Sequence, residues 1–314
     1  MAAVASSSPI LKCAAPDLLR DLDLSDDELT YLLDLADDVK RAPQDYSQAL
    51  AGKSVALLFE KPSLRTRLTF EIAILQLGGG SVFIEGPIGV REPLKDVARN
   101  LDRWVNGIVA RVFAQATVEG LAEWSSVPVI NALSDAYHPC QALADVETVR
   151  EHFGDLKGLK LAFVGDGNNV AHSLMLTCLR LGMDFALACP QGYNANPDVV
   201  MQAQGLAAVS GASLTLTHEP AEAVAGAHVI YTDVWASMGQ EQEAVERREA
   251  FREYQVNDGL FAVARPDAVF MHCLPAKRGE EVTDSVMEAE RSVVFDQAEN
   301  RLHAQKALLL MLLS

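Results

Sequence analysis

Short apolar runs alternate with longer amphipathic segments along almost the whole chain. The apolar runs lie at 54–59, 81–84, 107–112, 127–130, 160–165, 185–189, 213–217, 228–232, 269–272 and 293–295. Runs of this length are typical of buried strands. Apolar residues at helical spacing lie before and between them, as at 26–41, 65–77 and 138–153. Because parallel sheets are covered by helices on both faces, this alternation predicts an α/β protein.

The predicted strands form two series, one on each side of the helical segment 138–153. A chain of 314 residues, 49% of them hydrophobic, is long enough for about two domains. We therefore expect two domains, each a parallel sheet flanked by helices. The pattern places their boundary between about residues 140 and 155.

Composition narrows the class of partner and the compartment. A net charge of −17, with no basic run of five residues, argues against nucleic acid as a partner. No apolar window approaches the ~18 residues of a membrane span, and the N-terminus lacks a basic segment before an apolar stretch. The five cysteines show no C-x-x-C spacing, which favours reduced thiols over disulfides or a structural zinc site. We expect a cytoplasmic protein with no membrane partner.

Two places in the first half carry groups that suit an anion. The turn 61–67 lies between a strand and a helix, where Ser63 can cap the helix and Arg65 and Thr66 follow. Its free amides, hydroxyls and guanidinium could form a phosphate cradle, or the turn is an ordinary capped helix with solvated arginines. Arg111 ends a buried strand, so it meets either an anion or a structural carboxylate.

A further helix start lies at 138–141, where Pro139 suits the first helical position. His138 then lies near the cap and Gln141 in the first turn. The glycine-containing turn 165–169 lacks the third glycine of a dinucleotide site, and no acidic residue follows the next strand, so we exclude a nicotinamide cofactor. Asn169 either presents its amide to a cleft, or the turn is held by its own polar side chains.

Two strand ends in the second half bring further polar groups. Asp233 ends the strand 228–232 and either meets a substrate ammonium or caps a turn. His272 and Cys273 end the strand at 269–272, where α/β proteins bind ligands. They form either a pKa-tuned polar site or a buried thiol with a satisfied imidazole. Arg301, in a segment 298–301 that we expect to open the last helix, supplies another positive group.

Together these segments resemble the aspartate/ornithine carbamoyltransferase family, and they occur in that family's order over nearly the whole chain. The matching motifs are Ser63-Leu-Arg-Thr-Arg67, His138-Pro-Cys-Gln141, Gly165-Asp-Gly-Asn-Asn169, Asp233-Val-Trp-Ala-Ser-Met-Gly239, His272-Cys-Leu-Pro275 and Ala298-Glu-Asn-Arg301. The Ser-Met-Gly and His-Cys-Leu-Pro motifs favour the branch that acts on ornithine. The resemblance implies a carbamoyl-phosphate-binding domain 1–140, an ornithine-binding domain 141–297 and a C-terminal helix 298–314 that returns to the first domain, with interdomain helices joining the two.

The resemblance also assigns roles to individual residues. The residues expected to bind carbamoyl phosphate are Ser63, Leu64, Arg65, Thr66, Arg111, His138, Gln141, Leu274 and Arg301. The residues expected to bind ornithine are Asn169, Asp233, Ser237, Met238 and Cys273. Arg111, His138 and Cys273 would be catalytic, whereas His272 would only support the loop. We expect transfer of the carbamoyl group to the δ-amine of L-ornithine, with no metal and no cofactor, in a homotrimer or a multiple of trimers.

Two positions depart from the family pattern. Leu64 occupies a position where the family usually has Thr, so a hydroxyl contact is lost and the backbone amide remains. Pro87 stands where relatives present a Gln or His from a neighbouring subunit. Two alternatives stay open. The protein could carbamoylate another amine, such as acetylornithine, putrescine or aspartate, or it could be a catalytically silent paralogue that binds carbamoyl phosphate or a protein partner.

Overall fold

The computed structural model describes residues 9–236 and 241–314. The chain divides into two compact units: the first contains Met1–Ala132 and Leu302–Ser314, and the second contains Leu133–Arg301. The sequence predicted divisions at 140/141 and 297/298. The compact units divide instead at 132/133 and 301/302.

The first unit contains a four-stranded sheet with the order β2-β1-β3-β4. Its strands are β1 (Ser54–Phe59), β2 (Gly80–Glu85), β3 (Gly107–Arg111) and β4 (Val129–Leu133), the last of which ends at the unit boundary. Its helices are α1 (Asp26–Arg41), η1 (Pro43–Tyr46), α2 (Leu64–Gln76), α3 (Leu94–Leu101), α4 (Gln115–Glu123) and the C-terminal part of α12 (Val294–Leu313). Strands β1 and β3 are almost fully buried, as their continuous apolar runs predict.

Strand register brings two functional segments of the first unit to one edge of its sheet. The central strand β1 pairs in parallel with β2 and β3, and Phe59 lies opposite both Glu85 and Arg111. The three strands therefore end together. The turn after β1, which contains Ser63, and the end of β3 share the carboxyl edge, where open α/β sheets bind ligands.

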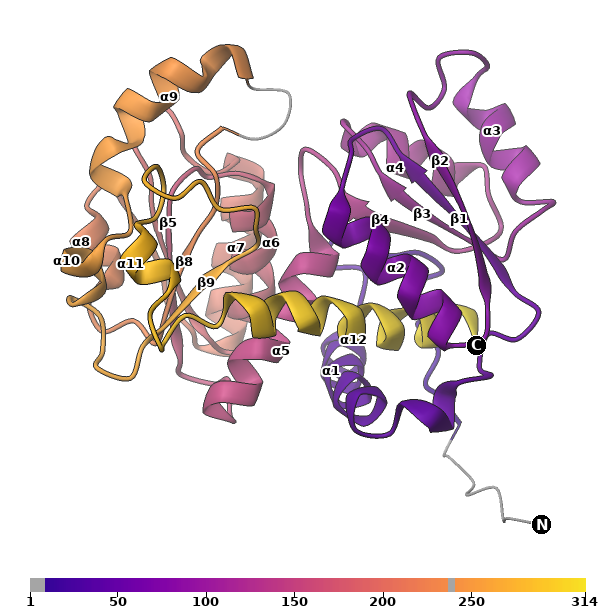
Figure 1. Cartoon of the computed structure of the whole chain (residues 1–314), viewed down its shortest axis with the longest axis horizontal. Coiled ribbons are helices and arrows are strands. Elements are labelled where there is room, and N and C mark those ends of the chain that lie inside the picture. The colour runs from indigo at the N-terminus through magenta and orange to yellow at the C-terminus, as the bar shows by residue number, and fades with distance from the viewer. Residues whose placement is uncertain (1–8, 237–240) are drawn as a thin grey trace. The chain divides into compact units, whose positions relative to one another are not determined.

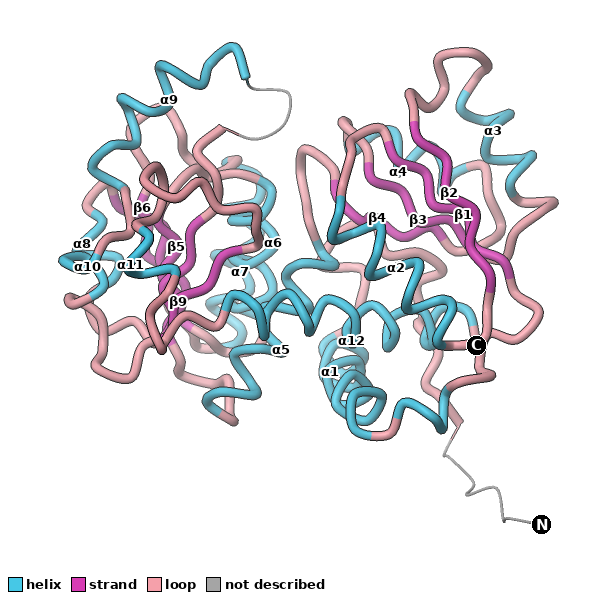
Figure 2. Tube along the Cα trace, in the orientation of Figure 1, coloured by secondary structure: helices cyan, strands magenta, loops and turns pink. Residues whose placement is uncertain are grey.

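The second unit contains a five-stranded sheet with the order β7-β6-β5-β8-β9. Its strands are β5 (Lys160–Val164), β6 (Asp184–Ala188), β7 (Leu214–Thr217), β8 (Val229–Thr232) and β9 (Val269–His272). Its helices are α5 (Pro139–Phe153), α6 (Asn169–Arg180), α7 (Pro197–Ser210), α8 (Pro220–Val224), η2 (Glu241–Glu243), α9 (Ala244–Phe251), η3 (Arg252–Tyr254), α10 (Asp258–Phe261), α11 (Asp284–Met287) and the start of α12. Every strand pair is parallel, and Figure 2 shows the strands within a shell of helices and loops.

The ends of β8 and β9 coincide in the second unit. Thr232 lies opposite His272 in their parallel register. The next residues, Asp233 and Cys273, therefore leave neighbouring strands at the same carboxyl edge. This placement follows from register, because the two residues are far apart in the sequence.

One predicted strand is wrong. The run 293–295 does not form a strand, because helix α12 begins at Val294 and not near 298. The chain meets β9 through an isolated bridge between Phe270 and Ser292. The Phe270 amide donates to the Arg291 carbonyl, and the Val293 amide donates to the Phe270 carbonyl. It then turns into the helix with Val294 buried in the core. A three-residue apolar run cannot by itself distinguish a strand from a buried helix start.

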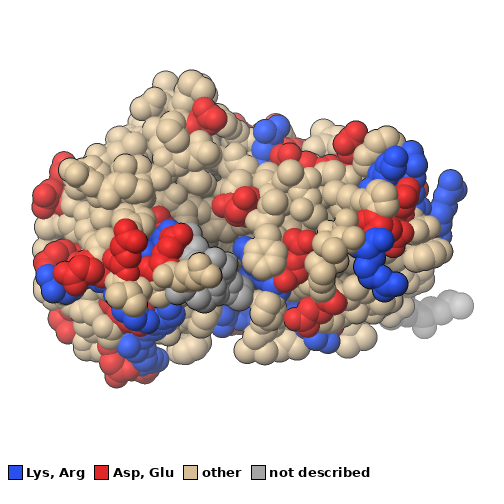
Figure 3. Space-filling model, turned by 90° about the horizontal axis from the view of Figure 1, so that it is seen from above, with Lys and Arg blue, Asp and Glu red and all other residues tan. Residues whose placement is uncertain are grey.

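Three observations concern the environment of the chain. All five cysteines are free thiols. Within the described ranges, no helix is long and apolar enough to cross a membrane. On the face drawn in Figure 3, Lys and Arg side chains lie among Asp and Glu side chains.

Candidate active site

The turn after β1 forms a capped helix start, as the sequence predicts. The Ser63 backbone is extended, and its hydroxyl accepts a hydrogen bond from the Thr66 amide at 3.2 Å. The other amides of the first turn of α2 point along the helix axis with a partial positive charge. Arg65 is half-buried in the same turn. This geometry suits an anion with several oxygen atoms.

Arg111 lies beside this turn. Its guanidinium, which is buried, donates from Nη1 to the Thr66 hydroxyl at 3.4 Å. The contact joins the end of β3 to the start of α2, as the shared sheet edge requires. Four residues predicted to bind carbamoyl phosphate are therefore neighbours: Ser63, Arg65, Thr66 and Arg111.

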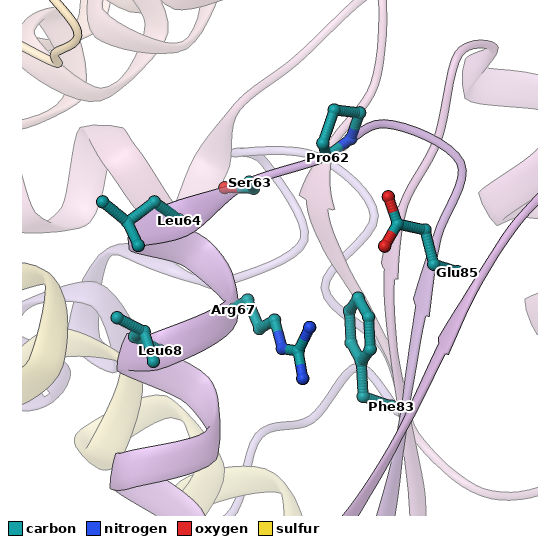
Figure 4. A pocket seen from close by; sticks show the side chains of 7 residues that line it. All are labelled: Pro62, Ser63, Leu64, Arg67, Leu68, Phe83 and Glu85. Carbon is teal, nitrogen blue, oxygen red and sulfur yellow. The ribbon is translucent and has the colours of Figure 1, made fainter.

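Leu64 is the first residue of α2, and its side chain is exposed. It lines a surface pocket beside the turn. The pocket has a volume of about 350 Å³, and its lining residues are Pro62, Ser63, Leu64, Arg67, Leu68, Phe83 and Glu85. Figure 4 shows the Arg67 guanidinium beside the Phe83 ring, and the guanidinium carbon lies 3.7 Å from the ring centroid. Arg67 Nε also contacts Glu71 Oε1 at 3.1 Å. The contact with Phe83 holds Arg67 against β2.

The segment that contains Pro87 is held by Glu60. One Glu60 oxygen accepts from the Ile88 amide at 3.1 Å, and the other accepts from the Phe113 amide at 2.8 Å. The carboxylate therefore ties this segment to the residues just after β3. Sequence patterns gave no signal for Glu60, because both of its partners are distant backbone amides.

In the second unit, His138 and Gln141 begin helix α5. His138 is the N-cap, Pro139 is the first helical residue as predicted, and the His138 amide donates to the Ser173 hydroxyl at 2.9 Å. The Gln141 side chain is fully buried. Its amide nitrogen donates to Asp145 Oδ1 at 2.8 Å, and its oxygen accepts from Arg301 Nη1.

Asp145 is the hub of a buried network that the sequence analysis missed. Besides Gln141, it accepts from Gln297 Nε2 at 2.7 Å and from the Tyr231 hydroxyl at 3.1 Å. Burial raises the pKa of Asp145 to about 7, although these hydrogen bonds oppose the shift. Burial also disfavours the charged form of Arg301 and so lowers its pKa. A guanidinium nevertheless remains charged at neutral pH. The only available signal was the spacing of Gln141 and Asp145, which places both on one helix face.

Asp233 and Cys273 form a direct contact. The Cys273 thiol donates to Asp233 Oδ1 at 3.0 Å, and the Val234 amide donates to the same oxygen at 2.8 Å. Asp233 Oδ2 accepts from the Asn168 side chain at 2.9 Å. Asp233 therefore caps its own turn and also contacts the neighbouring thiol.

Asn169 has different partners. Its amide nitrogen donates to the Ser134 carbonyl at 2.6 Å, and its oxygen accepts from the Val170 amide at 3.0 Å. Asn168, not Asn169, caps helix α6 and contacts Asp233. Ser237 and Met238 lie outside the described residues.

His272 is fully buried and supports the loop that follows it. Its Nδ1 accepts from the Leu274 amide at 2.8 Å, and its Nε2 lies 3.2 Å from Glu281 Oε1. Potential ligand atoms of Asp233, His272 and Cys273 lie within 4.8 Å of one another, the spacing of a possible metal site. In the present arrangement both imidazole nitrogens and the thiol take part in the hydrogen bonds given above.

Comparison with known proteins finds two domain models of one family that together cover most of the chain. The model of the aspartate/ornithine carbamoyltransferase carbamoyl-phosphate-binding domain matches residues 16–151, and that of the family's Asp/Orn-binding domain matches residues 157–312. This chain belongs to the aspartate/ornithine carbamoyltransferase family. In family terms, the capped turn and Arg111 lie in the carbamoyl-phosphate-binding domain, and the contact between Asp233 and Cys273 lies in the Asp/Orn-binding domain.

Individual family members are similar over nearly their whole length. Ornithine carbamoyltransferase of Thermococcus kodakarensis is 51% identical over 97% of this chain and 98% of its own. The structure of ornithine carbamoyltransferase from Pyrococcus furiosus is similar with a TM-score of 0.93 and 50% identity, over 97% of this chain and 99% of that one. A mutant N-acetyl-L-ornithine transcarbamylase is similar with a TM-score of 0.86 but only 34% identity, over 94% and 99% of the two chains.

Proposed function

We propose that this protein is an ornithine carbamoyltransferase. It transfers the carbamoyl group of carbamoyl phosphate to the δ-amino group of L-ornithine and gives L-citrulline and phosphate, a step of arginine biosynthesis. The observation that carries the proposal is the contact between Asp233 and Cys273 at adjoining strand ends. It lies in a chain that is about half identical, over nearly the full length, to relatives named ornithine carbamoyltransferase.

The phosphate group is assigned to the turn at the start of α2. Ser63, Arg65, Thr66 and the Leu64 amide surround the helix N-terminus, where an anion is stabilised by free amides and the helix dipole. Arg111, in contact with Thr66, is assigned to the carbonyl oxygen and the phosphate. Together these groups stabilise the charge that develops on the leaving phosphate.

The carbamoyl group and the amine are assigned to residues of the second unit. His138, Gln141, Arg301 and the Leu274 backbone contact the carbamoyl end. Ornithine is assigned to Asn169, Asp233, Ser237, Met238 and Cys273. Support comes from the common sheet edge of Asp233 and Cys273 and from the shared hydrogen bond of Gln141 and Arg301.

The chemistry requires a neutral amine. Its nitrogen attacks the carbonyl carbon, a tetrahedral oxyanion forms, and phosphate leaves. Since an alkylamine has a pKa of about 10 in water, the site must favour the deprotonated form. Asp233 and Cys273 orient the amine and assist the loss of its proton. Arg111 and His138 donate to the oxyanion, where one such contact contributes ~3–4 kcal/mol. Proximity and electrostatics, rather than a covalent enzyme intermediate, carry the reaction.

We further propose a homotrimer or a multiple of trimers. In the first unit, β2 lies at the sheet edge and pairs with β1 on one side. The outer surfaces of α2 and β2 expose apolar side chains, namely Leu64, Leu68, Ile72, Leu75, Val82 and Ile84. An edge strand beside exposed apolar side chains favours association with another chain.

Sedimentation tests this assembly. The wild type should sediment as a trimer or a multiple, and Leu68→Asp should shift it toward the monomer because a carboxylate would be buried. Val209→Asp is the matched control, because Val209 is an exposed apolar residue on α7. A monomeric wild type would contradict the proposed assembly.

A panel of amines tests the activity. The purified protein is offered carbamoyl phosphate with ornithine, acetylornithine, putrescine or aspartate, and both phosphate release and ureido product are measured. We expect product with ornithine. Preference for another amine would reassign the substrate. No turnover with any amine would instead support the silent paralogue that Leu64 and Pro87 leave open.

The proposed compartment is the cytoplasm. All five cysteines are free thiols, and two of them, Cys13 and Cys273, are partly exposed. Free thiols of this kind support a reducing environment.

A further inference from the structure

Leu274 has an unusual backbone conformation for its residue type. Its φ angle is 58°, and it is the one non-glycine residue in the described part of the chain with a positive φ. A side chain with a Cβ is disfavoured in this left-handed region, because the Cβ approaches the following carbonyl. Such a conformation persists only when its surroundings hold it, and strained residues of this kind concentrate at functional sites.

The residue that holds Leu274 is His272. Its Nδ1 lies 2.8 Å from the Leu274 amide nitrogen. A backbone amide can only donate, so Nδ1 must be the unprotonated acceptor. The proton of the neutral ring is therefore on Nε2, where it donates to Glu281 Oε1 at 3.2 Å. The hydrogen bonds thus select one tautomer of His272.

Glu281 connects this imidazole to the loop a second time. Its Oε1 also accepts from the Lys277 amide at 2.5 Å, so one oxygen ties His272 to the chain beyond Pro275. Both side chains are fully buried, and Glu281 Oε2 has no hydrogen-bond partner among the described residues. A buried carboxylate with one unmatched oxygen is poorly explained by stability. It is better explained by a requirement for a fixed loop.

Only one backbone polar group of Leu274 remains for a ligand. The amide is taken by His272, which leaves the carbonyl oxygen, an acceptor. The carbamoyl amino group of the proposed substrate is a donor. The two groups are complementary if the loop keeps its conformation.

We propose that His272, fixed in its Nε2-protonated tautomer by Glu281, is a positioning residue that holds the Leu274 carbonyl for the carbamoyl amino group. The inference rests on the proposed function, because it assigns a purpose to Leu274 only within carbamoyl transfer. His272 itself does not contact the substrate. It acts through the backbone of Leu274.

Two substitutions separate positioning from space filling. His272→Asn keeps an acceptor near the place of Nδ1 and gives up the contact with Glu281. His272→Gln keeps a donor near the place of Nε2 and gives up the acceptor for Leu274. A positioning role predicts that Asn preserves activity better. A role in filling space or in satisfying Glu281 predicts instead that His272→Gln preserves activity better. Gln is closer to His in volume, and it keeps the donor to Glu281.

The matched control is His228, which makes the same kind of hydrogen bond elsewhere in this unit. Its Nδ1 accepts from the Lys160 amide at 3.0 Å, at the starts of β8 and β5 rather than at their carboxyl ends. His228→Gln removes that contact far along the strands from Cys273. It should leave kcat within about twofold of the wild type, since it does not move a proposed substrate group.

Citrulline formation is measured for the full-length wild type and the three variants, with circular dichroism as a check of folding. His272→Gln should lower kcat by roughly 10²-fold, as expected for a misplaced binding group, with a much smaller change in the KM for ornithine. His272→Asn should lose less than about tenfold. Equal losses, or greater activity in His272→Gln, would overturn the positioning role. An inactive wild type would instead overturn the proposed function.

A spectroscopic measurement does not depend on the variants being active. Nitrogen NMR of the wild type labelled at histidine should show His272 as the neutral ring with its proton on Nε2. The signal is assigned by its loss in a His272 variant, or by its slow exchange with solvent if neither variant folds. A proton on Nδ1, or a charged ring, would contradict the inference.

Discussion

The two units present their proposed ligand groups by different physical means. In the first unit, a contiguous turn offers backbone amides and a few half-exposed side chains around Ser63. In the second unit, Gln141, Asp145, Gln297 and Arg301 form a buried network. The turn depends on local backbone geometry, so we expect single side chains such as Leu64 to be replaceable there. The members of the network are buried and share hydrogen bonds, so each member constrains the next.

The largest expected effect comes from removing the buried arginine of the first unit. Arg111→Ala should lower kcat/KM by ~10²–10³-fold, because it removes a proposed donor to the developing oxyanion. Arg99→Ala is the control, since Arg99 is an exposed residue that stacks on Trp124. Steady-state kinetics with ornithine measure both. An Arg111→Ala enzyme with wild-type kcat/KM would remove the turn from the proposed mechanism.

The network of the second unit should appear in the pH dependence of stability. The pKa of Asp145 is raised to about 7 in the folded protein, so between its unfolded pKa and pH 7 the folded state binds more protons than the unfolded state. The free energy of unfolding therefore falls as pH rises through this window and levels off above it. Asp145→Asn, which is neutral and of similar shape, should remove this contribution.

The change is measurable by denaturant unfolding of both proteins at pH 5 and pH 8. Relative to the wild type, Asp145→Asn should gain roughly 2–3 kcal/mol at pH 8 compared with pH 5. A difference between the two proteins that does not vary with pH would mean that Asp145 is ionised throughout this range.

Asp233 tests whether the second unit carries the amine. Asp233→Ala should raise the KM for ornithine or lower kcat by roughly 10–10²-fold, since a charged hydrogen bond contributes about 1.5–3 kcal/mol. Carbamoyl phosphate binding, followed by calorimetry, should stay near its wild-type affinity. Asp233→Asn keeps the acceptor for Val234 and should separate the charge from the turn geometry. Unchanged ornithine kinetics in Asp233→Ala would contradict the assignment.

The smallest effect is expected in the turn after β1, which contains Ser63. Leu64→Thr adds the hydroxyl that the family resemblance led us to expect there, and it should lower the KM for carbamoyl phosphate by about 2–10-fold, the contribution of one hydrogen bond. The KM for ornithine should not change. If Leu64→Thr altered stability as strongly as the network variant, the contrast between the two units would fail.

Predictions from the sequence succeeded where the deciding partners are close in the chain. The cap of Ser63 on Thr66 spans three residues, and Pro139 begins α5 as expected. Most of the strands were predictable because they are short, mainly apolar runs. The run 293–295 was too short for that rule. The chain pairs with β9 at an isolated bridge at Ser292, and helix α12 then begins at Val294.

What the sequence alone determined was the α/β class, the two units and the family, because these depend on local periodicity and on motifs in a fixed order. The tertiary structure alone decided the partners of those motifs. It joined Gln297 to Asp145 across 152 positions, brought Cys273 to Asp233, and placed Glu281 behind His272. Hydrogen bonds between buried groups depend on where strands end and helices cross, and no spacing along the chain encodes those distances.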